Sequence, residues 1–113
     1  MGNEASQSAI RAAMADMVNA VTALRQSGHG VMAEALKNLA ERISGCALPP
    51  QDRQDLIENL VFIGQQGQVV PERRKRGVVK ASCAYAKLFM QTSEPLNDAW
   101  HSFGHTIESF FHF

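Results

Sequence analysis

The chain is poor in the residue types that mark specialised protein classes. Its 113 residues include only two cysteines, Cys46 and Cys83, which excludes a dense disulfide framework. Because no secretory signal precedes them, we expect both to be thiols in a reducing, cytoplasmic setting. No apolar run approaches the roughly 20 residues that a membrane-spanning helix needs, so we expect no membrane span.

An excess of charge of one sign is also lacking. Eleven basic and eleven acidic side chains give a formal net charge of zero. This balance argues against a generally basic nucleic-acid binder, and a hydrophobic content of 45% argues against disorder. Near neutrality also removes long-range repulsion between copies, so self-association is electrostatically permitted. The length predicts a single domain over 1–113, with a flexible start at 1–5.

The first residues, MGNEAS, fit the pattern for N-myristoylation, with Gly2 as acceptor and Ser6 at the favoured position. The pattern is short, and Met1-Gly2 could equally precede an excised domain. One lipid chain would also give only marginal membrane binding. We therefore do not expect this modification.

The spacing of apolar residues predicts helices nearly throughout. We expect helices at about 6–27 and 31–43, a third from Pro50 to a weak end at Gly64 and Gly67, a fourth after Pro71 or Gly77, and a last one after Pro95. All four prolines, including Pro49, fall at expected helix entries. The predicted fold is all-α: a compact bundle of four or five amphipathic helices with short loops.

The same spacing predicts which faces are buried. In the second helix we expect a buried stripe of Val31, Ala35, Leu36, Leu39 and Ile43. In the fourth we expect burial of Val78, Ala81, Tyr85, Leu88 and Phe89.

The last helix carries histidines at metal-ligand spacing. His101, His105, Glu108 and His112 are separated by four, three and four residues, so they share one narrow stripe. A metal site is the alternative, but zinc needs ligands that converge from several elements or a pocket. The HExxH arrangement is also absent. We favour a solvated face and expect no metal and no cofactor.

The aromatic residues of the last helix lie nearly opposite its histidines. We predict a partner-binding surface here, formed by Leu96, Trp100, Phe103, Phe110 and Phe111. Some of these must belong to the core, and the sequence does not separate the two groups.

The only charge run is Arg73, Arg74, Lys75 and Arg76. Four adjacent cations near a helix start are unfavourable for the helix dipole, which suggests an anionic partner such as a nucleic acid or an anionic surface. Against this, consecutive helical residues point in different directions. We favour a solvated turn, paired with Glu72 or Asp98.

Catalytic signatures are missing. No G-x-S-x-G, phosphate loop or paired-carboxylate arrangement occurs, and Cys83 lies in an apolar stretch typical of a core residue. His29, between two glycines, reads as a solvated turn residue. We therefore expect that the protein is not an enzyme.

From about Ala33 to Phe113, the chain resembles a helical tail module that closes many uncharacterised bacterial proteins. The likeness rests on the runs AEALKNLAERI, LPPQDRQDLIENLVFIGQQ and VPERRKRGVVK, and on a final helix with Trp100 and a Phe-rich end. It implies assembly or signalling in bacterial conflict systems and supplies no active-site residues. The chain departs from the pattern at Phe62 and Gly64, where acidic residues or alanine are usual. The overall prediction is a non-enzymatic helical interaction or self-association module.

Overall fold

A computed structural model describes the backbone of residues 2–113 and the side chains from residue 7 onward; Met1, and with it the start of the expected flexible segment, lies outside this range. The described chain forms α1 (Gly2–Gln26), α2 (Gly30–Ser44), α3 (Pro50–Gln68), the 3-10 turn η1 (Pro71–Arg73), α4 (Arg76–Met90) and α5 (Glu94–Phe110). The predicted all-α bundle is confirmed, with five helices and no strand in this part of the chain.

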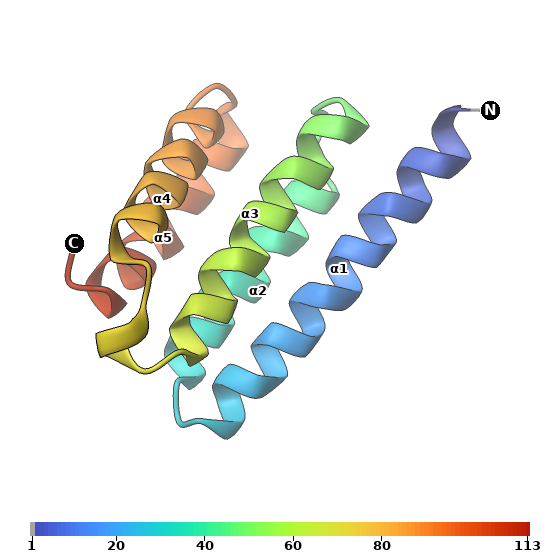
Figure 1. The fold of residues 1–113 in the computed structure, drawn as a ribbon. Coiled ribbons are helices and arrows are strands. Elements are labelled where there is room, and N and C mark those ends of the chain that lie inside the picture. The colour runs from blue at the N-terminus through green and yellow to red at the C-terminus, as the bar shows by residue number, and fades with distance from the viewer. Residues whose placement is uncertain (1) are drawn as a thin grey trace.

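The helices run alternately up and down in a bundle (Figure 1). α2, α3, α4 and α5 each pack against the next one, and α5 returns to pack against α2. α1 lies against the edge made by α2 and α3, on the side away from α4 (Figure 1). α4 therefore contacts α3 and α5 and is left at the outer edge of the bundle.

Both α1 and α5 end in a Schellman turn. After α1, Gly28 has a φ of 84°, its N–H donates to the carbonyl of Arg25, and the N–H of His29 donates to that of Leu24. The predicted end of the first helix at about residue 27 agrees with the observed end at Gln26. At the end of α5, His112 takes the same left-handed conformation with a φ of 62°, which is uncommon for a residue other than glycine.

The third helix ends one residue past the predicted Gly67, at Gln68, but Gly64 lies inside the helix and is not part of its end. α3 continues through both glycines to Gln68, and both are buried. A Cβ atom on Gly64 would lie 3.1 Å from Leu36 Cδ1, and one on Gly67 would lie 3.2 Å from Leu24 Cδ2. The glycines are therefore contact points, where α1 and α2 approach the backbone of α3 closely.

The buried face predicted for the fourth helix is wrong. Val78 is 52% exposed, Tyr85 43% and Leu88 70%, and Ala81 is exposed as well. The buried residues of α4 are instead Val79, Cys83, Ala86 and Met90. Only Phe89 of the predicted set packs partly against the core. Periodicity fails here because α4 is apolar on two sides, and spacing alone does not say which side meets the bundle.

We expect alanine substitutions on the two faces of α4 to have different costs. Met90→Ala should lower the free energy of unfolding by about 2–5 kcal/mol because it opens a cavity in the core. Leu88→Ala should change it by less than about 1 kcal/mol because the side chain is largely in water. Urea unfolding followed by circular dichroism checks both values, and equal costs would place Leu88 in the core after all.

Candidate functional site

The predicted aromatic surface of α5 is divided between core and exterior. Leu96, Trp100 and Phe111 are buried, at 1%, 3% and 4% exposure. Phe103 and Phe110 pack partly against the core and stay partly exposed. Among the residues predicted to bind a partner, only these two present surface in the isolated chain.

Phe110 lies where four elements meet. Its ring stands edge-on to the imidazole of His29, with 5.0 Å between ring centroids. The ring also faces Gly67 of α3, where the absence of a side chain makes room for it. It packs edge-on against the ring of Phe111, with 5.0 Å between the two ring centroids. His29 is half-buried by this contact, so its prediction as a solvated turn residue is wrong. Phe110 therefore acts mainly as packing at one end of the bundle.

Arg74 joins the same end of the bundle. Its Nε donates to the carbonyls of Gln66 (3.1 Å) and Val69 (2.9 Å), and its Nη2 donates to that of Gly67 (3.2 Å). Its guanidinium also lies 5.0 Å from the ring centroid of Phe110. These carbonyls are at the C-terminal end of α3, where helix carbonyls lack intrahelical partners and a cation is favourable.

The basic run is consequently not a set of four free cations. Arg76 donates to the carbonyl of His112 (2.9 Å) and lies over the ring of Phe113, so it holds the end of the chain. Neither Arg74 nor Arg76 pairs with Glu72 or Asp98 as predicted; the one ion pair within the described residues joins Arg25 and Glu34 at 2.8 Å. The arginines bind carbonyls and rings because they face a helix C-terminus and the aromatic end of α5. Arg73 and Lys75 remain exposed.

The histidine stripe of α5 faces outward. His101, His105 and His112 are exposed, and Glu108 is half-buried. Within the described residues, no group of three or more His, Cys, Asp or Glu side chains is placed to hold a metal ion. His105 instead lies beside Ser109, with 3.5 Å between Nε2 and Oγ.

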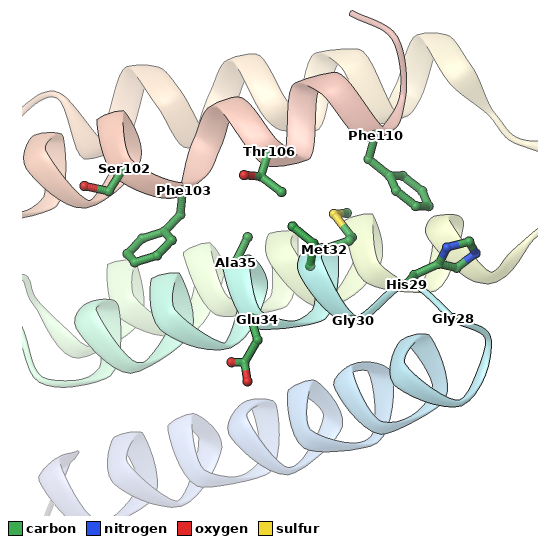
Figure 2. Close-up of a pocket in the computed structure, with 11 residues that line it drawn as sticks. Gly28, His29, Gly30, Met32, Glu34, Ala35, Ser102, Phe103, Thr106 and Phe110 are labelled. Carbon is green, nitrogen blue, oxygen red and sulfur yellow. The ribbon is translucent and has the colours of Figure 1, made fainter.

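A groove of about 790 Å³ runs between the start of α2 and α5 (Figure 2). Phe103 and Phe110 stand at its α5 side, and Ala35 and His29 lie across from them (Figure 2). Val31, predicted to be buried, is 76% exposed at this groove because α2 turns its opposite side to α1 and α3. Sequence periodicity gave no signal for the groove, since it depends on how two distant helices meet.

A second apolar surface follows the outer side of α4. We call Val78, Ala81, Tyr85 and Leu88 the α4 stripe; they are separated by three, four and three residues, so they lie along one side of the helix. These residues were identified from the sequence, but as core. The spacing that suggested burial is equally the spacing of a helix-binding face.

Charged groups flank the α4 stripe on two sides. Lys80 and Lys87 lie on the side of α5, around a small cavity that Glu108 also lines. On the side of α3, Asp55 and Asp52 lie near Tyr85. The pKa of the Tyr85 hydroxyl is raised, mainly by its partial burial and to a smaller extent by these two carboxylates. The hydrogen bond from Asn59 Nδ2 to the carbonyl of Ser82 (2.8 Å) fixes the register of α3 against α4.

The two thiols differ in environment. Cys83 is buried on the core side of α4, as predicted. Its burial, and to a smaller extent the negative charge of Glu108, raises its thiol pKa to about 12. Cys46 lies partly exposed in the loop between α2 and α3. Neither is in a disulfide.

Comparisons of the chain with protein-family models, with curated proteins and with solved structures find no match. The resemblance to a helical tail module therefore stays a prediction. Within the described residues, no helix combines the length and apolar character needed to cross a bilayer.

Neighbouring arginines should differ sharply in their effect on stability. Arg74→Met should lower the free energy of unfolding by about 2 kcal/mol, because it removes charge-assisted bonds to three carbonyls. Arg73→Met, the matched control one residue away, should stay within about 0.5 kcal/mol. Urea titration of both variants checks this, and equal stability would show that the Arg74 contacts contribute little.

Alkylation should distinguish the two cysteines. At pH 8.5 Cys83, with a pKa of about 12, is almost wholly a neutral thiol and is shielded, so iodoacetamide should modify Cys46 first. In urea, both should react at similar rates. Peptide mass spectrometry checks the order, and rapid native labelling of Cys83 would contradict its burial.

Proposed function

We propose that this chain is a non-enzymatic helical interaction module and that the outer face of α4 is its main binding surface. Support comes from the α4 stripe, whose exposed large side chains follow the spacing that helices use to pack against one another. An apolar stripe at helical spacing in water is costly for a monomer, whereas an isolated exposed Val or Leu is ordinary.

The surface proposed here differs from the one predicted at sequence level. Of the five residues predicted to bind a partner on α5, only Phe103 and Phe110 are not fully buried. The ring of Phe110 already contacts Arg74 and His29. Within the α4 stripe, Tyr85 contacts the ring of Phe89, with 5.9 Å between ring centroids, while Val78 and Leu88 are 52% and 70% exposed. We therefore assign binding to α4 and give Phe110 a role in closing the bundle.

Binding to a nucleic acid or an anionic surface remains the alternative prediction. It would rest on Arg73 and Lys75, since Arg74 and Arg76 have partners within the chain. Two cations would release few counterions, so any such binding would be weak at physiological salt.

Site-specific photo-crosslinking tests the interaction surface. A benzophenone amino acid at Leu88, in cells that naturally make the protein, should yield crosslinked protein adducts. The same probe at Val18, which is 60% exposed on α1, serves as the matched control and should yield few. Equal yields at both positions, or none at either, would refute the assignment to α4.

A further inference from the structure

We propose that the α4 stripe binds the α4 stripe of a second copy of this chain, with the two helices antiparallel. This proposal rests on the proposed function and adds the identity and orientation of the partner. It is supported by the shape of the stripe and by the charges around it.

The stripe has large and small residues at positions that complement each other in an antiparallel pair. When two copies pair about an axis at the height of Cys83, Val78 of one copy faces Leu88 of the other, and Ala81 faces Tyr85. Each layer then joins a smaller side chain to a larger one, so the two helix axes stay at an even separation. A parallel pair would place Tyr85 against Tyr85 and Ala81 against Ala81, forcing the helices apart at one layer and leaving a gap at the next.

The residues beside the stripe permit close approach. Gly77 and Ala84 are exposed on one side of it, and a Cβ atom on Gly77 would meet nothing within 4 Å. Ser82 lies on its other side, toward α3, as does Phe89, which packs partly against the core with its ring centroid 5.9 Å from that of Tyr85. Lys80 and Lys87 are rotated further away, beside Glu108, so they do not lie between the two helices.

Charge along the α3 side favours the same orientation. Lys75 is at the start of α4, next to the C-terminal end of α3, where its N–H bonds Gln66 Oε1 (2.9 Å). Asp52 and Asp55 lie beside the other half of α4, near Tyr85. An antiparallel pair places the α3 sides of both copies along the same edge and brings Lys75 of one copy toward Asp52 of the other. A parallel pair instead places Lys75 beside the α5 side of the other copy, which carries Lys80 and Lys87. The zero net charge of the chain adds no general repulsion.

The contact is small, which sets the expected affinity. The stripe extends over ten residue steps, or about 15 Å of helix, and offers three large side chains. This is less than the surface that a tight dimer buries, so we expect a dissociation constant on the order of 100 μM. Light scattering and sedimentation equilibrium up to millimolar concentration should detect the dimer. Leu88→Glu should weaken it at least about tenfold, and Val18→Glu should not.

Exchange of the large and small residues tests the pairing of Ala81 with Tyr85. Ala81→Tyr alone should weaken the dimer because Tyr85 of the other copy occupies the facing position. Combined with Tyr85→Ala, the same substitution restores one large and one small side chain per layer. Recovery of affinity in the double variant is expected, and equally weak association in both variants would contradict the antiparallel register.

Cysteine crosslinking tests the orientation, in a chain whose own thiols are replaced by Cys46→Ser and Cys83→Ala. A mixture of Val78→Cys and Leu88→Cys copies should form disulfide heterodimers on oxidation, because these positions face each other. Val78→Cys alone should not, since its two copies would be about 15 Å apart along the helices. Efficient crosslinking of Val78→Cys with itself would show a parallel pair and overturn the proposal.

A chain that stays monomeric to millimolar concentration would also overturn it. The photo-crosslinking result at Leu88 separates this outcome from failure of the proposed function. Adducts at Leu88 with a monomeric chain would mean that the α4 stripe binds a different protein. If neither crosslinked adducts nor a dimer is found, both proposals are wrong.

Discussion

The close approach of helices to the backbone of α3 is the constraint on which the rest of the bundle depends. Gly64 and Gly67 leave room for Leu36 of α2 and Leu24 of α1, and Gly67 also admits the ring of Phe110 from α5. A methyl group at Gly64 would lie 3.1 Å from Leu36, and one at Gly67 would lie 3.2 Å from Leu24 and 3.4 Å from the Phe110 ring. Three helices therefore reach α3 through one small-residue surface. Glycine carries a helix-propensity cost of about 1 kcal/mol at each position, and the packing that it permits offsets this cost.

The packing around Gly67 also determines the contacts at the end of the bundle where α3 and α5 finish. Phe110 reaches Gly67, and Arg74 donates to the carbonyls of Gln66, Gly67 and Val69 while its guanidinium lies against the same ring. Arg74 of the basic run thus caps the C-terminal end of α3, while Arg73 and Lys75 remain exposed. On α4, one of the two apolar faces is enough to cover α3 and α5. The other face is left in water, and the proposed interaction surface rests on this exposed apolar face.

Much of the fold was predictable because its signals are local. Pro50 and Pro95 start helices where their missing N–H groups are tolerated, and Gly28 stops one through a left-handed turn. The candidate site was much less predictable. Spacing correctly grouped Val78, Tyr85 and Leu88 on one side of a helix, but it assigned that side to the core. The role of Arg74 had no sequence signal, since its carbonyl partners become available only once α3 ends beside it.

The sequence by itself determined the all-α class, the approximate helix boundaries and the separation of histidines from aromatic residues on α5. These features depend on backbone geometry and on residues three or four positions apart, which a single chain segment contains. Only the tertiary structure decided which face of α4 is buried, which arginines are engaged, and that Phe111 is core while Phe103 lines a groove. Each of these depends on contacts between segments far apart in the chain. A helix with two apolar faces can bury either one, and only its neighbours determine which is left exposed.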